Sequence, residues 1–210
     1  YVLVGDDFRF GARRAGDYAL LDASGARHGF DVARMMSYEV HGLRVSSSAV
    51  RQALADGDMA QAAALLGRPY AISGHVVHGR KLGRALGESA AGTGDGFRTL
   101  NLRFGHPRPA AGGIFVAQVH GLGDAPLPGV ASLGVRPTVE DAGRVLLEVH
   151  CLAWPPALGE AYGRVVQVEL LHKLHDERRY ASIDALREGI AADVAEARRW
   201  WAGAGPRHSQ

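Results

Sequence analysis

The 210-residue sequence has few of the features that mark secreted, membrane-spanning or nucleic-acid-binding proteins. Its one cysteine, Cys151, cannot form an internal disulfide, so nothing requires an oxidising compartment. No apolar run reaches the roughly 20 residues of a membrane-spanning helix, and no signal-peptide pattern is present. The ten histidines show no metal-ligand spacing, and the net charge of +2 is too small to indicate nucleic-acid binding. We therefore expect a cytoplasmic protein that binds neither membranes nor nucleic acids.

The first 68 residues have the pattern of part of an α/β domain. Tyr1–Val4 is typical of a buried strand, which needs neighbouring strands on both sides. The loop and helix signals that follow offer few such neighbours, so we expect an N-terminal portion of this domain to precede the sequence. A short helix is predicted from Asp58 to Leu66, with Asp58 as its cap and Gly67 at its end.

Two segments of this region carry residues suited to ligands. A glycine-bracketed turn from Gly5 to Gly11, which contains Asp7, follows the strand where α/β sheets usually bind ligands, although an ordinary loop has the same pattern. Ser46, Ser47 and Ser48 lead into a predicted helix from Ala49 to Leu54, which these serines can cap and whose free N–H groups can bind an anion; Arg51 lies in its first turn. Capping alone explains one serine, but not three serines together with Arg51.

From Tyr70 onward, short β-rich runs alternate with glycine and proline. They span residues 71–77, 100–104, 113–120, 130–133, 146–152 and 165–171. Six such runs without helices between them predict a small antiparallel barrel. An amphipathic helix with Ser182 as its N-cap is predicted to close the domain, followed by a disordered tail.

The loop after the first barrel strand has the composition of a phosphate site. Gly79, Gly83 and Gly87 are spaced four residues apart, and glycine lets backbone N–H groups approach phosphate closely. Lys81 and Arg84 can neutralise the phosphate charge. A flexible basic hairpin is an equally good interpretation of this pattern alone.

The next strand presents two neutral oxygen ligands on one face. Strand alternation places Thr99 and Asn101 together, opposite Leu100 and Leu102. Such a pair suits Mg²⁺, which keeps several waters and takes other ligands from phosphates. A solvated strand face is the alternative.

A carboxylate interrupts a later apolar strand. Alternation places Glu148 opposite Leu147 and Val149 and beside Leu146 and His150. Because burying an unpaired carboxylate is costly, Glu148 either faces solvent or takes part in acid/base chemistry.

These segments, in this order, resemble the bacterial bifunctional riboflavin kinase/FMN adenylyltransferase (FAD synthetase) family from Val2 to about Arg199. The matching segments are VGDDFRFG, VSSSAVRQAL, LLGRPY, GHVVHGRKLGRALG, the Thr99/Asn101 pair, PAAGGIFVAQV, GVASLGVRPTV and LLEVH. So many matches in order make the resemblance specific.

The resemblance implies two modules. Residues 1–68 would be the C-terminal portion of a Rossmann-like nucleotidyltransferase domain, residues 69–203 a six-stranded riboflavin kinase barrel with a C-terminal helix, and residues 204–210 a tail. The implied activity is phosphorylation of riboflavin to FMN with Mg-ATP. Adenylylation of FMN to FAD is expected in the complete protein and not from this chain alone, because the family's His-x-Gly-His motif lies upstream.

The resemblance also implies roles for individual residues. Thr99 and Asn101 would coordinate the Mg²⁺ of Mg-ATP, and Glu148 would take the proton of the ribityl 5′-hydroxyl. The residues implied in ATP binding are Gly79, Lys81, Gly83, Arg84 and Gly87 in the kinase and Ser47, Ser48 and Arg51 in the adenylyltransferase. Those implied on the flavin side are Asp7, Arg136 and Leu186.

The chain departs from the family pattern at several positions. Residues 88–96 are inserted after Gly87, and Arg98 stands where the family has proline, which would preset the backbone before Thr99. Ala153 and Trp154 stand in place of Asp-Phe, and His175 stands where an arginine is expected near the C-terminal helix.

Two other functions are compatible with a small barrel. A non-catalytic flavin- or nucleotide-binding barrel is plausible given the insertion and the missing proline, but retention of Thr99, Asn101 and Glu148 argues against it. An oligonucleotide-binding barrel would need aromatic stacking platforms, and the predicted strands offer few beyond Phe104 and Phe115.

Overall fold

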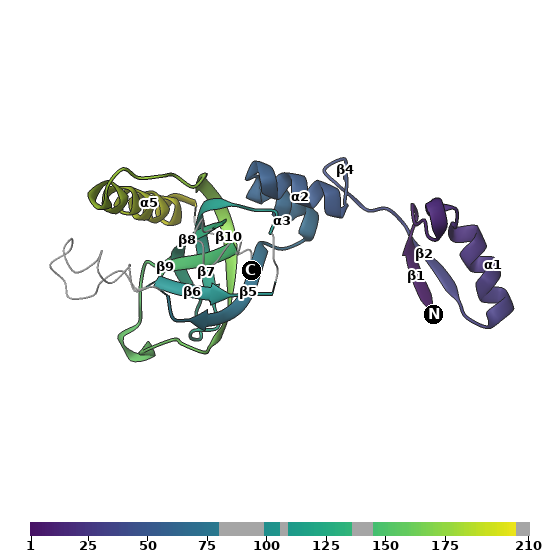
Figure 1. The fold of residues 1–210 in the computed structure, drawn as a ribbon, viewed down its shortest axis with the longest axis horizontal. Coiled ribbons are helices and arrows are strands. Elements are labelled where there is room, and N and C mark those ends of the chain that lie inside the picture. Colours follow the sequence, from purple (N-terminus) through teal and green to yellow (C-terminus); the bar gives the residue numbers. More distant parts are fainter. Residues whose placement is uncertain (80–98, 106–108, 136–144, 205–210) are drawn as a thin grey trace. The chain divides into compact units, whose positions relative to one another are not determined.

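The computed structural model describes residues 1–79, 99–105, 109–135 and 145–204 (Figure 1). By packing, the chain divides into two compact units, Tyr1–Ser47 and Ser48–Gln210. The predicted boundary between modules, at residues 68 and 69, stays a prediction.

The first unit contains two parallel strands and one longer helix. Its elements are β1 (Val2–Gly5), η1 (Ala12–Arg14), α1 (Tyr18–His28), β2 (Val32–Met35), β3 (Glu39–Val40) and β4 (Leu43–Arg44). Strand β1 pairs in parallel with β2, and β3 pairs antiparallel with β4. Asp17 caps α1 by accepting a hydrogen bond from the Leu20 N–H at 3.0 Å. Gly29 ends the helix in the left-handed region, at φ 75°.

The strand predicted at the start of the sequence is present, but it is not buried on both faces. Val4 is 8% exposed and Leu3 is 56% exposed. Since successive side chains of a strand point to opposite faces, one face of β1 is covered and the other is open in the described structure.

Six antiparallel strands of the second unit close into a barrel, in the order β10, β5, β6, β9, β8, β7. Their bounds are β5 (Tyr70–Val77), β6 (Thr99–Arg103), β7 (Gly113–His120), β8 (Leu127–Val135), β9 (Val145–Cys151) and β10 (Val165–His175). Each contains or overlaps one of the six predicted runs, so the predicted antiparallel barrel is confirmed.

Strand alternation fills the interior of the barrel with apolar side chains. Leu100 and Leu102 of β6 are 4% and 1% exposed, and Leu147 and Val149 of β9 are fully buried. Phe115 of β7 is among the largest fully buried side chains. Burying each such side chain contributes about 1.5–3 kcal/mol. The apolar interior positions leave Thr99, Asn101 and Glu148 on the outer face, opposite Leu100, Leu102, Leu147 and Val149, as the strand alternation predicted.

Among the described residues of this unit, three α-helices accompany the barrel: α2 (Ser47–Asp56), α3 (Met59–Leu66) and α5 (Ile183–Ala204). The predicted caps of α3 are confirmed, because Asp58 accepts from the Gln61 N–H at 2.9 Å and Gly67 is left-handed at φ 69°. Helix α3 packs against β5 and β10.

The C-terminal helix lies on the outside of the barrel (Figure 1). Ser182 caps α5, as predicted, by accepting a hydrogen bond from the Ala185 N–H at 3.1 Å, and α5 packs against β7, β8 and β10. The helix continues through Ala204, and residues 205–210 of the predicted tail lie outside the described residues. Within the described segments, no helix has both the length and the apolar composition to cross a membrane.

The single cysteine is expected to be unreactive in the folded protein. Cys151 is 4% exposed at the end of β9, and burial raises the pKa of its thiol to about 12. The thiolate is the species that reacts with thiol reagents. At about pH 8, a thiol reagent should therefore not label Cys151 of the native chain within minutes. In urea, where the chain is unfolded, the same reagent should label this one cysteine. Rapid labelling of the native chain would show that this end of β9 opens.

Candidate functional site

The register of β6 and β9 brings the predicted metal ligands next to the predicted base. Asn101 lies directly opposite Glu148, and Thr99 lies directly opposite His150. Directly opposed residues on one face of an antiparallel pair have Cβ atoms about 4.5–5.5 Å apart. All four residues are half-buried, so each is partly covered by the barrel and partly exposed.

The same face continues onto both neighbouring strands. Ser132 of β8 lies opposite Glu148, and Val77 of β5 lies opposite Asn101. The barrel therefore presents a row of four side chains, with Asn101 and Glu148 at its centre. Sequence periodicity predicts which residues share a face, but it cannot predict this cross-strand register.

Gly79 follows β5 and lies against the Asn101 amide. A Cβ atom at Gly79 would overlap the Asn101 side chain, with its Cγ at 2.5 Å. This close contact between Gly79 and Asn101 explains why residue 79 is a glycine, because any side chain there would displace the Asn101 amide. No positive φ angle is needed to explain it. Gly79 thus supports the position of Asn101, in addition to any contact with phosphate.

We expect Gly79→Ala to lower the kinase activity implied by the family resemblance about tenfold, in line with the effect of losing a group that orients a metal ligand, the role predicted for Asn101. Its melting temperature should stay close to that of the parent chain, because the displaced atoms are the end of a side chain. Gly123→Ala is the matched control, since a Cβ there meets no atom within 4 Å. Equal activity of the two variants would contradict the supporting role of Gly79.

Several predicted site residues lie outside the described residues. They are Lys81, Gly83, Arg84, Gly87 and Arg136, together with the insertion at residues 88–96 and the departure at Arg98. Their roles stay predictions.

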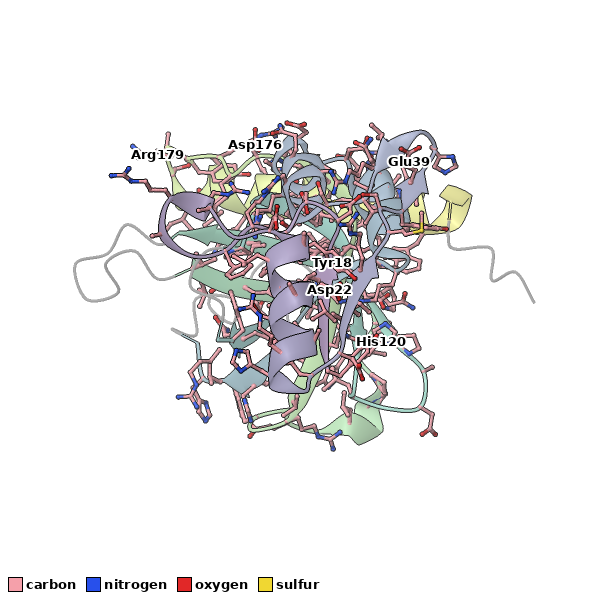
Figure 2. The ribbon with its side chains drawn as sticks, turned by 90° about the vertical axis from the view of Figure 1, so that its right-hand side faces the viewer. Tyr18, Asp22, Glu39, His120, Asp176 and Arg179 are labelled. Carbon is pink, nitrogen blue, oxygen red and sulfur yellow. The ribbon has the colours of Figure 1, made fainter. Side chains whose placement is uncertain are left out.

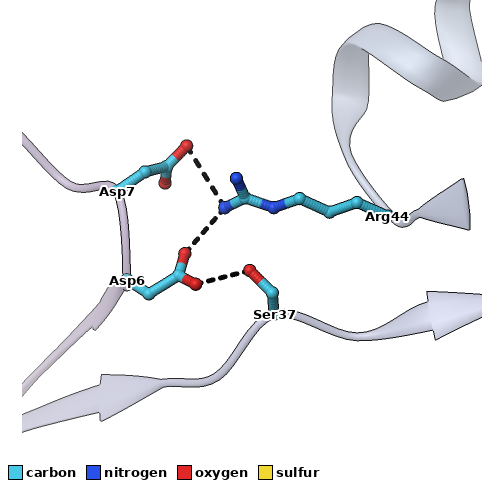
Figure 3. Close-up of polar contacts among 4 residues, drawn as sticks. All are labelled: Asp6, Asp7, Ser37 and Arg44. Carbon is cyan, nitrogen blue, oxygen red and sulfur yellow. Dashed lines mark hydrogen bonds and ion pairs between the residues drawn. The ribbon is translucent and has the colours of Figure 1, made fainter.

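A second polar cluster, in the first unit, contains the predicted Asp7 (Figure 3). The Arg44 guanidinium donates to Asp6 Oδ1 at 2.7 Å and lies 3.3 Å from Asp7 Oδ2, while Ser37 Oγ donates to Asp6 Oδ2 at 2.5 Å. The Ser37 hydrogen bond, and then the charge of Arg44, lower the pKa of the exposed Asp6 carboxyl. The cluster joins the loop after β1 to β4 and to the segment after β2. Sequence reasoning missed Ser37 and Arg44, because the fold, and no local motif, brings them to Asp6.

Ser47, Ser48 and Arg51 occupy the first turns of α2, and all three are exposed. The exposure of these side chains permits contact with an anion, but exposed side chains are equally typical of a helix N-terminus that faces only solvent. Their predicted contact with ATP phosphates stays a prediction.

The segment between β10 and α5 adds a carboxylate that sequence reasoning also missed. The Glu177 carboxyl group lies against Gly134 of β8, where any Cβ atom would overlap it. Gly134 is two residues from Ser132 and therefore on the same face of β8 as the row that contains Glu148. Leu186, predicted on the flavin side, is half-buried near the start of α5.

The residues of this face fit a magnesium ion that arrives with a nucleotide. The described residues contain no group of three or more His, Cys, Asp or Glu side chains that could hold a metal ion, so an all-protein cage is absent from them. They do offer two neutral oxygen ligands with a carboxylate opposite. This donor set suits Mg²⁺, which takes few protein ligands and completes its shell with water and phosphate.

Comparison with protein families gives two matches. A family model described as riboflavin kinase matches residues 66–201, and a model described as FAD synthetase matches residues 1–49. The first spans the barrel, α5 and the row of side chains on β6 and β9.

Individual relatives agree with the family models. The chain is 45% identical over 201 residues to the bifunctional riboflavin kinase/FMN adenylyltransferase of Escherichia coli K12, covering 96% of this chain and 60% of that protein. It is 44% identical to the protein of the same name from Pseudomonas fluorescens, covering 94% of this chain and 60% of that protein. The chain thus spans about 60% of the length of these relatives.

A solved structure covers most of the chain as well. It is described as a macrolide-efflux protein from Streptococcus pneumoniae and superposes with a TM-score of 0.67 at 27% identity, covering 93% of this chain and 59% of that one. The match extends over both compact units.

Proposed function

The chain belongs to the riboflavin kinase family, and from this premise we propose that it transfers the γ-phosphoryl group of Mg-ATP to riboflavin, forming FMN. The observation that carries the proposal is the direct pairing of Asn101 with Glu148, which brings the proposed metal ligand opposite the proposed base on one face of the barrel. Phosphoryl transfer needs these two groups close together.

In the proposed reaction, Glu148 positions the ribityl 5′-hydroxyl and takes its proton. The hydroxyl oxygen forms a bond to the γ-phosphorus while the bond from that phosphorus to the ADP oxygen breaks. Thr99 and Asn101 would hold Mg²⁺, which would supply charge neutralisation on the phosphates of the nucleotide. Gly79, Lys81, Gly83, Arg84 and Gly87 are proposed to bind the ATP phosphates, and Arg136 and Leu186 to contact the flavin.

A direct assay distinguishes the proposed kinase from the alternative, a non-catalytic flavin- or nucleotide-binding barrel. The chain is incubated with riboflavin and Mg-ATP, and FMN is separated by chromatography, with a reaction lacking Mg²⁺ as control. Magnesium-dependent formation of FMN supports the proposal. Riboflavin binding without FMN formation would make the chain a binding barrel.

For the complete protein, we propose a second activity, adenylylation of FMN to FAD. The match of residues 1–49 to the FAD synthetase model supports it. Asp7 is proposed on the flavin side, and Ser47, Ser48 and Arg51 near the ATP phosphates. The Arg44 contact with Asp6 and Asp7 would fix the loop that carries Asp7.

A further inference from the structure

The Glu177 carboxylate lies over the outer face of the barrel, although Glu177 belongs to the segment that connects β10 to α5. A Cβ atom at Gly134 of β8 would overlap Cδ and both oxygens of this carboxyl group. The φ angle of Gly134 is not positive, so the backbone conformation does not require a glycine there. The missing side chain instead leaves room for the carboxylate to fold back onto the sheet.

The chain is fixed directly before Glu177. Lys173 Nζ lies 2.6 Å from Asp176 Oδ1, and the Lys173 side chain is 17% exposed. His175 Nε2 lies 2.7 Å from Asp193 Oδ1 on α5, and both of these side chains are 12% exposed. These two contacts hold the start of the segment against β10 and α5.

The chain is fixed again directly after Glu177. A Cβ atom at Gly189 of α5 would overlap the Tyr180 ring, and Ser182 caps α5. Between these fixed points Arg179 is exposed, and its side chain projects away from the ribbon in Figure 2. Glu177, by contrast, is turned onto β8, and because the residue as a whole is exposed, a ligand can reach its carboxylate.

The strand order places Gly134 on the side of Glu148 from which riboflavin would approach. Strand β6, with Thr99 and Asn101, lies on one side of β9, and β8 lies on the other. In phosphoryl transfer the attacking and leaving oxygens lie roughly in line, on opposite sides of the phosphorus. With Mg-ATP held on the β6 side of Glu148, the attacking hydroxyl comes from the β8 side, where Gly134 and Glu177 lie.

The spacing on this face fits the length of a ribityl chain. Glu148 lies opposite Ser132, so Gly134, two residues farther along β8, is its diagonal neighbour at about 7–8 Å. A carbon–carbon single bond is about 1.5 Å long, so a five-carbon chain spans about 5 Å, and an O–H···O hydrogen bond adds about 2.7 Å. A riboflavin whose 5′-hydroxyl contacts Glu148 can therefore reach Glu177 with another hydroxyl of the same chain.

We propose that Glu177 is a substrate-binding residue, which accepts a hydrogen bond from a ribityl hydroxyl and so selects flavins that carry this chain. Hydrogen bonds from a hydroxyl to a carboxylate are short and strong, and an ionised carboxylate can only accept them. Gly134 admits the carboxylate to this position. The inference rests on the proposed kinase function, which places the 5′-hydroxyl at Glu148.

The first test compares the binding of two flavins, measured by quenching of their fluorescence in the presence of Mg-ADP, which has no γ-phosphoryl group to transfer. Lumiflavin has the ring system of riboflavin with a methyl group in place of the ribityl chain. Glu177→Ala should weaken riboflavin binding at least about tenfold, the usual effect of losing a hydrogen bond to a charged group, and leave lumiflavin binding unchanged. Glu177→Gln keeps one acceptor oxygen and should lie between. Glu196→Ala is the control, since Glu196 is exposed in the second half of α5, and it should bind both flavins like the parent.

The second test is a double-mutant cycle with Gly134. The Cβ atom of Gly134→Ala would displace the Glu177 carboxylate, so this variant should bind riboflavin as weakly as Glu177→Ala does. The double variant should then bind no more weakly than either single variant, because both remove the same interaction. In steady-state kinetics, each variant should raise the KM for riboflavin and leave the KM for ATP near that of the parent.

Unchanged riboflavin binding in Glu177→Ala, or an equal loss for riboflavin and lumiflavin, would overturn the proposal. Additive losses from Gly134→Ala and Glu177→Ala would overturn it as well, since Gly134 would then act independently of the carboxylate. A parent chain that binds riboflavin but forms no FMN would refute the proposed kinase function, while the comparison of the two flavins would still decide the role of Glu177.

Discussion

Glu148→Gln is expected to lower the turnover of riboflavin phosphorylation by roughly 10²- to 10⁴-fold, the usual contribution of a positioned base. Glutamine keeps the size of the side chain and one oxygen, so riboflavin should still bind, but the amide cannot take the proton. Steady-state formation of FMN gives the turnover, and quenching of flavin fluorescence gives the binding.

Glu169→Gln on β10 is the matched control for this substitution. Glu169 is another partly buried barrel carboxylate, and it pairs with His120 at 3.3 Å, away from the Glu148 row. We expect its turnover to stay near that of the parent. If flavin binding and turnover disappear together in Glu148→Gln, Glu148 is a structural residue and the proposed base is wrong.

Asn101→Ala is expected to lower kinase activity by at least about tenfold, since losses of metal ligands and their supports commonly cost about 10- to 100-fold. The loss should be greatest at limiting Mg²⁺, because the variant has one protein ligand fewer for the ion. The measurement is activity as a function of Mg²⁺ concentration at fixed ATP.

Asn101→Asp separates the loss of a ligand from damage to the strand. Its carboxylate keeps an oxygen in the position of the amide oxygen, and oxygen is the atom that Mg²⁺ binds, so it should retain more activity than Asn101→Ala. Thermal melting should show both variants folded. Full activity of Asn101→Ala at every Mg²⁺ concentration would show that Asn101 is not a ligand.

The elements that the sequence predicts well are those whose pattern is set by burial. Leu100, Leu102, Leu147 and Val149 alternate with polar residues because they fill the barrel, and this alternation also places Glu148 on the outer face. Helix α3 is also predicted well from the sequence, because Asp58 and Gly67 set its two ends through local hydrogen bonds and backbone angles.

The elements that the sequence does not predict depend on contacts between distant segments. Strand β2 is short and contains Arg34, so its pairing with β1 has no periodic signal. Three contacts could not be predicted for the same reason, because polar side chains on loops and strand ends follow no fixed spacing in the sequence. These contacts are Arg44 with Asp6, Glu177 with Gly134, and His175 with Asp193. They lie at or beside the candidate sites, where polar groups replace apolar packing.

Closure of the barrel by its last strand has a consequence for synthesis of the chain. Strand β10 pairs with β5 on one side and with β7 on the other, so until Val165–His175 leaves the ribosome, β5 and β7 both expose unpaired edges. Contacts between residues so far apart in sequence form slowly, and open strand edges invite pairing with other chains. The nascent chain should therefore be most prone to misassembly just before β10 emerges, and a chain truncated before Val165 should aggregate instead of folding.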